Sequence, residues 1–248
     1  MPRISARISW VPTALFIVAV PLFLVTASVT WAFNSPGLYE DGFEKYQISL
    51  TSGITSADLR QVGAQLRGYL NSNDEPLDVR TRILGTEREL FNPAEIAHMR
   101  DVKRLVWGVY ILGAVSAVYL LATLIAGFWR RRRGFVGALA PRLLWGGALT
   151  LVLLIAFGLL AATGFDSLFL RFHQLSFAND FWQLDPRTDY LVRLFPQDFW
   201  FDATMWVALR AITGALILTA AGGGYLLYHH WTTAQQERAK SLDEATET

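Results

Sequence analysis

The sequence predicts a membrane α-helical fold: a bundle of four transmembrane helices, a small α+β extracytoplasmic domain between spans one and two, and an interfacial segment between spans three and four. Three observations predict this fold. Apolar residues make up 52% of the 248 residues and charged residues only 17%. Four apolar stretches reach the roughly 20 residues that a helix needs to cross a bilayer. Tryptophans or tyrosines stand at the ends of several stretches, as is typical of membrane interfaces.

The first apolar stretch is long enough to remain in the mature protein as a span. Trp10 and Trp31 are about 31 Å apart along a helix at 1.5 Å per residue, and a bilayer core is roughly 30 Å thick. The alternative is a cleaved signal peptide with Arg3 and Arg7 as its basic region. Its apolar part is too long for that, Pro21 lies inside it, and no clear small-residue cleavage site follows. We therefore expect a retained helix.

The ends of the apolar stretches divide the chain into eight predicted parts. In order they are the N-terminus and first span (1–33), an extracytoplasmic module (34–104), the second span (105–129), an arginine-rich cytoplasmic loop (130–141), the third span (142–164), an extracytoplasmic interfacial segment (165–203), the fourth span (204–228) and a cytoplasmic tail (229–248).

The arginines between the second and third spans predict the orientation. Arg130, Arg131, Arg132, Arg133 and Arg142 crowd this short connection, and short loops rich in arginine face the cytoplasm. Four spans then place both termini inside and the two longer connections outside. Binding of anionic lipid is the alternative reading of the arginine run. The protein is expected in a cytoplasmic membrane, with membrane lipid around its spans.

The extracytoplasmic module begins with a predicted helix and hairpin. The stretch TSADLRQVGAQLRGYL has apolar residues at helical spacing, namely Leu59, Val62, Leu66 and Tyr69. The cluster NSNDEP is typical of a turn. The following stretch DVRTRILGTEREL combines β-branched residues with a central glycine, which favours a short β-hairpin.

A second predicted helix leads from this module into the membrane. In FNPAEIAHMRDVKRL, Asn92 is a typical helix cap, Pro93 suits the first helical position, and Glu95 stands three residues after the cap. Nothing breaks the helix before the second span. We expect one helix from Asn92 to Trp129, whose first turns rise above the membrane.

Composition excludes several functions. The net charge of +1 argues against nucleic acid as a partner. The absence of cysteine excludes a disulfide, a thiol nucleophile and a thiolate metal site. The predicted spans are nearly free of ionisable groups, apart from Arg142 and Arg210 near the ends of theirs. A pump or ion-coupled transporter normally has such groups at membrane depth, so this function is disfavoured.

The glycines of spans three and four predict close helix packing: Gly146, Gly147, Gly158, Gly214 and Gly222–Gly224.

Two of the four histidines are candidates for chemistry. His98 shares a helix face with Glu95 and Asp101, its i−3 and i+3 neighbours. His173 follows the third span on the same side of the membrane, so the topology allows the two histidines to meet. The alternative is that each is an ordinary hydrogen-bonded or solvated interfacial residue. His229 and His230 are adjacent and therefore point in different directions along a helix, which favours interfacial anchoring.

Motifs for other chemistries are absent from the sequence. There is no HExxH and no pair of histidines at i and i+4, so no metal site is expected. There is no GxSxG, the turn that carries the serine of many esterases. No cofactor is expected either.

The mixed polarity of RFHQLSFANDFWQLDP is typical of a segment at the membrane interface. We expect its apolar side chains among acyl chains or headgroups, and these are Phe172, Leu175, Phe177 and Phe181. We expect its polar side chains to face a pocket, and these are His173, Gln174, Asn179, Asp180 and Asp185. The alternative is an interfacial brace for the helix bundle.

Two stretches also resemble a known family. AEIAHMRDVKRL before the second span and FHQLSFANDFWQLDPRTDYLVRLFP before the fourth are similar to signatures of the lipoprotein intramolecular transacylase family of bacterial integral membrane proteins. The resemblance implies an enzyme that acts on diacylated bacterial lipoproteins. It implies transfer of the sn-2 acyl chain from the diacylglyceryl group to the cysteine α-amino group, which gives a lyso-form lipoprotein. The family's two important histidines correspond to His98 and His173.

General acid–base chemistry suits the implied reaction. An imidazole of pKa about 6.5 can take a proton from an attacking amine and return one to a leaving alkoxide. We expect His173 as the base and His98 as proton donor or oxyanion stabiliser. Asp101 or Glu95 is expected to orient His98. Asn179 or Gln174 is expected to donate hydrogen bonds to the negative charge that develops during the reaction, with Asp180 nearby.

The competing hypotheses are a non-catalytic scaffold or chaperone of envelope components, and a small-solute transporter.

Overall fold

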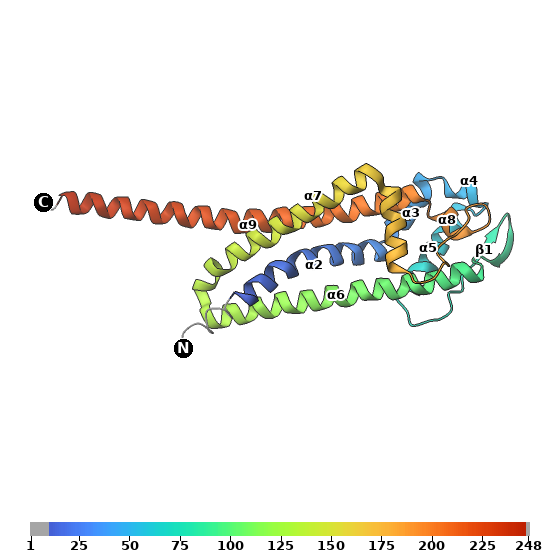
Figure 1. Cartoon of the computed structure of the whole chain (residues 1–248), viewed down its shortest axis with the longest axis horizontal. Helices are drawn as coiled ribbons and strands as arrows, with labels where there is room; N and C mark the ends of the chain where they lie inside the picture. The colour runs from blue at the N-terminus through green and yellow to red at the C-terminus, as the bar shows by residue number, and fades with distance from the viewer. Residues whose placement is uncertain (1–9, 247–248) are drawn as a thin grey trace. The chain divides into compact units, whose positions relative to one another are not determined.

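The computed structural model describes residues 10–246, and most of this part of the chain is helical (Figure 1). Four of its helices are long and apolar enough to cross a membrane, which confirms the four predicted spans. They are α2 (Val11–Asn34), α6 (Pro93–Arg131), α7 (Phe135–Ser176) and α9 (Gln197–Thr246). Arg3 and Arg7, on which the signal-peptide alternative rests, lie outside the described residues.

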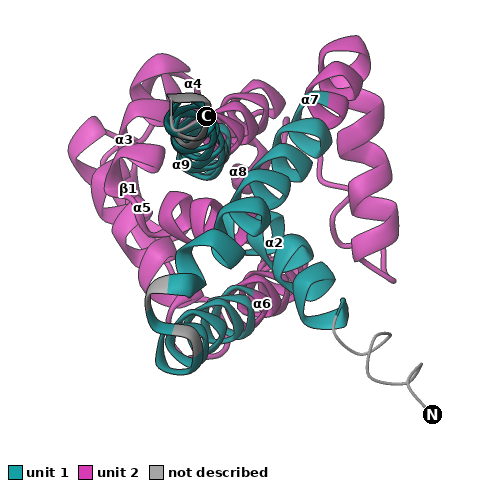
Figure 2. Ribbon diagram, turned by 90° about the vertical axis from the view of Figure 1, so that its left-hand side faces the viewer, with its two compact units in different colours: residues 1–24, 113–155, 210–248 teal, residues 25–112, 156–209 magenta. Residues whose placement is uncertain are grey.

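The chain forms two compact units, each assembled from segments that are distant in sequence (Figure 2). Unit 1 comprises the chain up to Leu24 with 113–155 and 210–248, and unit 2 comprises 25–112 and 156–209. Each of the four long helices therefore belongs partly to one unit and partly to the other.

Small residues allow the helices of unit 1 to approach closely. A Cβ added to Gly146 would stand 2.8 Å from Val20, and one added to Gly214 would stand 2.8 Å from Leu24. Gly147 faces Thr219, and Gly222 faces the backbone of Ala140 and Leu144. The predicted role in packing is confirmed for these four glycines. Gly158 and Gly224 have no described atom within 4 Å of that position, so close packing does not explain them.

The connection between α6 and α7 is shorter than the loop predicted over 130–141. Only the 3₁₀ turn η1 (Arg132–Gly134) separates the two helices. The helix α7 begins directly after this turn, at Phe135. The Phe135 side chain is buried, and its ring lies where a Cβ of Gly127 would stand, so it packs against the last turns of α6. Most of the predicted loop is therefore helical.

Unit 2 contains the module between the first two spans. Its elements are α3 (Pro36–Lys45), α4 (Ile48–Ser52), α5 (Ser56–Leu70), β1 (Arg80–Ile83) and β2 (Thr86–Glu89). The short helix α8 (Tyr190–Leu194) follows later in the chain, and its Leu191 and Leu194 belong to the same hydrophobic core. The segment before the fourth span thus packs with the first module.

The helix and hairpin predicted in this module are confirmed. Thr55 caps α5, and the four residues predicted on its inner side are all buried, namely Leu59, Val62, Leu66 and Tyr69. The strands β1 and β2 pair antiparallel, with Arg80 opposite Glu89 and Ile83 opposite Thr86. Gly85 adopts a positive φ of 82° in the turn, a conformation that glycine tolerates.

The start of α6 is fixed by a capping box. The side-chain Oδ1 of Asn92 accepts hydrogen bonds from the backbone N–H of Ala94 and Glu95, at 2.9 and 3.1 Å. Glu95 Oε2 in return accepts from the N–H of Asn92 at 2.7 Å, so the unpaired donors of the first turn are satisfied. The helix predicted from Asn92 to Trp129 is confirmed as Pro93–Arg131.

Lys103 and Trp107 attach α6 to the end of α5. The Trp107 indole donates to the carbonyl of Leu70 at 3.0 Å. The buried Lys103 ammonium donates to the carbonyl of Asp74 at 2.6 Å and lies 4.0 Å from the centre of the Tyr69 ring. These contacts hold the first turns of α6, which carry His98, against the module.

Candidate active site

His98 and His173 lie side by side in unit 2. Their ring centroids are 5.9 Å apart, with 33° between the ring planes. His98 stands in the second turn of α6 and His173 in the last turn of α7. The backbone of α7 is not helical at Gly164, so a separate helical stretch carries His173 beyond the end predicted for the third span.

Aromatic rings surround His173. The ring centroids of Phe169, Phe172, Phe177 and Trp182 lie 4.3, 5.4, 5.5 and 5.4 Å from that of the histidine. With His98, these rings leave the imidazole few directions in which to turn. Sequence reasoning assigned no role at the site to Phe169 or Trp182, although Trp182 belongs to the mixed-polarity stretch that drew attention to this segment.

One hydrogen bond indicates the tautomer of His173. Its Nδ1 lies 2.8 Å from the backbone oxygen of Phe169. A carbonyl oxygen can only accept a hydrogen bond, so Nδ1 carries the hydrogen. In the neutral ring Nε2 then has a free lone pair and can accept a proton.

His98 is buried, with only 7% of its surface exposed. Phe177 packs edge-on against its ring at a centroid distance of 4.9 Å. Its Nδ1 is enclosed and has no hydrogen-bond partner among the described residues. A buried polar atom without a partner costs roughly 1–3 kcal/mol, and such exceptions call for a functional or structural explanation.

Asp101 and Asn179 join the two histidine-bearing helices. Asn179 belongs to the loop after α7 and donates a hydrogen bond of 2.8 Å to Asp101, one turn beyond His98 on α6. Arg104 also donates to Asp101, at 3.3 Å. Asp101 thus lies next to His98 on the helix and is hydrogen-bonded to the loop.

Glu95 accepts hydrogen bonds from backbone N–H groups at the starts of two helices, α6 and α8. It is almost completely buried, and besides the N–H of Asn92 it accepts from the N–H of Leu191 at 2.6 Å. The carboxylate therefore caps the start of α6 and holds the first turn of α8 to it. Both of its oxygens are occupied by these bonds and neither bonds to His98.

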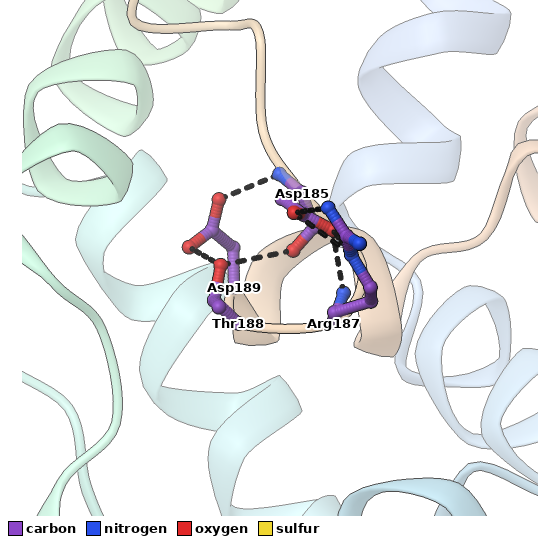
Figure 3. A network of polar contacts seen from close by, with 4 residues as sticks. All are labelled: Asp185, Arg187, Thr188 and Asp189. Atoms are coloured by element: carbon purple, nitrogen blue, oxygen red, sulfur yellow. Dashed lines mark hydrogen bonds and ion pairs between the residues drawn. The ribbon is translucent and has the colours of Figure 1, made fainter.

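Figure 3 shows how the loop before α8 is fixed. Asp189 accepts from the backbone N–H of Asp185 at 2.7 Å and from Thr188 at 2.9 Å. Asn92 donates to Asp189 at 2.9 Å, which connects this network to the cap of α6. Two hydrogen-bonding groups of Arg187, its side chain and its backbone N–H, lower the pKa of Asp185 to about 2.

The remaining predicted polar residues lie at the edge of this arrangement. Asp185 bonds within its own loop to Arg187. Asp180 is exposed and accepts a hydrogen bond from Gln183 at 2.7 Å. Gln174 is exposed on the last turn of α7. Sequence reasoning missed Asp189 and the second role of Asn92, because both depend on contacts between distant parts of the chain.

Three of the four large apolar residues predicted to face lipid are exposed, and one is not. Phe172, Leu175 and Phe181 are exposed. Phe177 is buried, with 8% of its surface exposed, so the prediction for this residue is wrong. Its ring lies within 5.5 Å of both imidazoles, because the chain turns after Ser176 and brings it under them.

The other two histidines are adjacent residues of α9. His229 lies in α9 with its ring 6.1 Å from that of Tyr225, and His230 is exposed next to it. Among the side chains that the structure describes, no three from His, Asp or Glu are close enough together to hold a metal ion.

Three comparisons relate the chain to known proteins. A family model described as lipoprotein intramolecular transacylase Lit matches residues 14–200. An uncharacterized protein of Aquifex aeolicus (strain VF5) is 32% identical over 133 residues, which are 53% of this chain and 56% of that protein. The match therefore spans little more than half the length of that relative.

Solved structures share the fold. The membrane integral lipoprotein intramolecular transacylase Lit from Bacillus cereus superposes with a TM-score of 0.71 at 19% identity, over 94% of this chain and 99% of that chain. A variant of the same protein with one histidine changed to arginine superposes with a TM-score of 0.68 at 18% identity, over 94% and 96%. At these identities the likeness shows a shared fold.

Proposed function

Because this chain belongs to the lipoprotein intramolecular transacylase family and is a multi-pass membrane protein, we propose that it transfers an acyl chain within a bacterial lipoprotein. The substrate is a lipoprotein whose N-terminal cysteine carries a diacylglyceryl group. The sn-2 acyl chain moves to the α-amino group of that cysteine. The product is a lyso-form lipoprotein with an amide-linked acyl chain and a free glycerol hydroxyl.

The reaction needs no co-substrate. The lone pair of the neutral amine attacks the ester carbonyl carbon, a C–N bond forms, and the C–O bond to glycerol breaks. One proton leaves the nitrogen and one arrives on the glycerol oxygen. An α-amino group has a pKa of about 8, so a base is needed near neutral pH. Because both reacting groups belong to one molecule, good orientation can supply roughly 7–11 kcal/mol of rate enhancement.

The geometry of the two histidines supports a division of roles. His173 takes the proton of the amine at Nε2, while its Nδ1–H bond to Phe169 maintains the required tautomer. His98 donates a hydrogen bond that stabilises the oxyanion, and His173 returns the proton to the leaving oxygen, so that both rings end the reaction as they began. The observation that carries this proposal is the 5.9 Å separation of two imidazoles that come from different helices.

The proposed site faces the outer leaflet. Five arginines lie between Arg130 and Arg142, and the bias of arginine toward the cytoplasm places that turn inside. The histidines stand at the opposite ends of α6 and α7, where these helices belong to unit 2. Both termini then lie in the cytoplasm.

The cysteine-free sequence allows a direct test of this orientation. A single cysteine is introduced by Glu87→Cys in β2 or by Ser241→Cys near the end of α9, both at exposed positions. In intact cells a membrane-impermeant maleimide should label the first variant and leave the second unlabelled until the cells are opened. The reverse pattern contradicts the orientation.

Mass spectrometry of a lipoprotein tests the proposed reaction. The chain is expressed in a bacterium that does not N-acylate its lipoproteins, and the N-terminal lipopeptide of one lipoprotein is analysed. We expect an acyl group on nitrogen together with a free glycerol hydroxyl. His98→Ala and His173→Ala should abolish this product, whereas His230→Ala should not. Diacylated lipopeptide alone, with the membrane protein present at normal levels, contradicts the proposal.

A further inference from the structure

An apolar groove lies on the last turns of α6, in unit 1. It is shallow and largely open, and it is lined by Leu124, Ile125, Phe128 and Trp129. Ile125 and Phe128 are exposed, and 88% of the surface of Trp129 is accessible. Because this part of α6 is apolar enough to lie in a membrane, the groove is open to lipid acyl chains.

Positive charge stands directly beyond the groove. Arg130 and Arg132 follow Trp129, and both side chains are exposed. From Gly113 to Ile155 the sequence contains five arginines and no aspartate or glutamate. Within the described part of the chain, no carboxylate forms an ion pair with Arg130 or Arg132. The groove therefore ends at a basic turn without its own counter-charge.

The turn is held in a defined conformation. The buried ring of Phe135 occupies the space beside Gly127 and meets the ring of Phe128 edge-on at a centroid distance of 4.9 Å. Arg132 adopts a positive φ of 46°, a conformation that residues with a side chain adopt only rarely. Packing of Phe135 thus fixes the position of the basic turn relative to Phe128, one wall of the groove.

We propose that this groove and turn form a binding site for an anionic phospholipid. One acyl chain lies along Leu124 and Phe128, Trp129 lies at the boundary between acyl chains and headgroups, and the phosphate and the headgroup charge lie beside Arg130 and Arg132. A neutral lipid fills the groove equally well but leaves more of the positive charge uncompensated. A second copy of the chain on this surface brings two basic turns together, which like charges disfavour.

Fluorescence of Trp129 tests the proposal. The protein is placed in a series of nanodiscs with an increasing fraction of brominated phosphatidylglycerol or brominated phosphatidylcholine, because bromine on an acyl chain quenches a nearby indole. The chain has nine tryptophans, so the contribution of Trp129 is the difference between the wild type and Trp129→Phe. The double variant Arg130→Gln/Arg132→Gln removes two of the four consecutive positive charges of the turn, and Arg238→Gln removes one positive charge elsewhere as a control.

The two lipids should give different results. Each arginine near an anionic lipid contributes on the order of 1 kcal/mol, which is about fivefold in affinity. We expect half-maximal quenching of Trp129 at a several-fold lower fraction of brominated phosphatidylglycerol than of brominated phosphatidylcholine. The double variant should reduce this difference clearly and Arg238→Gln should keep it. Equal quenching by both lipids, or no quenching by either because another surface covers Trp129, overturns the proposal.

This site is independent of the proposed acyl transfer, because it involves no residue of the histidine pair. Loss of lipid selectivity in the double variant leaves the transacylase proposal untouched, and an inactive chain can still select its lipid.

Discussion

Asn179 donates a hydrogen bond of 2.8 Å to Asp101 and thereby joins the loop that follows His173 to the helix that carries His98. The two histidines stand near the ends of separate helices, so their separation depends on what connects those helices nearby. Asn179 is fixed in turn by its Oδ1, which accepts from the backbone N–H of Phe181 at 3.1 Å. We infer that this bond positions the histidine pair.

Exchanging the two side chains tests that inference. Asn179→Asp alone places two carboxylates against each other, and the like charges should separate the loop from α6. We expect the rate of lyso-form production to fall by roughly tenfold or more, a loss of about 1.4 kcal/mol. Adding Asp101→Asn restores a donor and an acceptor and should recover much of the rate. Gln183→Ala, which removes an exposed bond in the same loop, is the control.

The ring of Phe177 should also matter for activity. It is buried and lies against both imidazoles, so Phe177→Ala leaves a cavity under them and allows each ring to turn. A cavity left by removing a buried phenyl ring costs about 3–5 kcal/mol of stability. We expect Phe177→Ala to lower both thermal stability and rate, and Phe177→Leu to lower both less. The exposed Phe181 offers the matched substitution Phe181→Ala, and an equal effect there would refute the specific role of Phe177.

Glu95 is expected to contribute to stability more than to chemistry. Its two oxygens accept from backbone N–H groups of α6 and α8. In Glu95→Gln the amide NH₂ faces a backbone donor, and a buried unpaired group costs about 1–3 kcal/mol. The thermal unfolding midpoint in detergent should fall clearly, whereas Glu40→Gln, at an exposed position of α3, should leave it unchanged. An unchanged midpoint for Glu95→Gln would show that the double cap is dispensable.

The Arg187–Asp185 pair predicts a pH dependence. The pKa of Asp185 is lowered to about 2 by Arg187, from an ordinary value of about 3.9. A lowered pKa in the folded state stabilises the fold above the ordinary value, and this contribution disappears as pH falls toward 2. Arg187→Gln should therefore lower the unfolding midpoint by a constant amount between pH 5 and 8, and by less below about pH 4. If the difference in unfolding midpoint between the wild type and Arg187→Gln grows as the pH falls, the direction of this pKa shift is contradicted.

Local patterns in the sequence were sufficient for the elements that local contacts determine. The cap at Asn92 and Glu95 involves residues three apart, and it correctly predicted where α6 begins. The spacing of Leu59, Val62 and Leu66 predicted the buried side of α5. The apolar stretches predicted four helices of sufficient length. Their ends were less predictable, because packing such as that of Phe135 on Gly127 lets the helices extend beyond the apolar stretches.

The candidate site depends on contacts between distant parts of the chain, and this limited its prediction. Topology allowed His98 and His173 to meet, but their approach depends on the non-helical backbone at Gly164 and on the Asn179–Asp101 bond. Glu95 shares a helix face with His98, which suggested an orienting role. Of its two actual partners, the N–H of Asn92 follows from the local capping pattern, whereas the N–H of Leu191 is 96 residues away and leaves no local pattern. The burial of Phe177 was missed because the chain turns immediately before it.

The central claim is that His98 and His173 act together on one acyl transfer. The most direct test is the rate of lyso-form production by the purified protein from a synthetic diacylated lipopeptide, for His98→Ala, His173→Ala and the double variant. Acid–base catalysis by a histidine contributes on the order of 10²–10⁴-fold, and residues that act as a unit are not additive. We predict a loss of this size for each single variant and no further loss for the double variant. A single variant with wild-type rate, or losses that multiply in the double variant, would contradict the account.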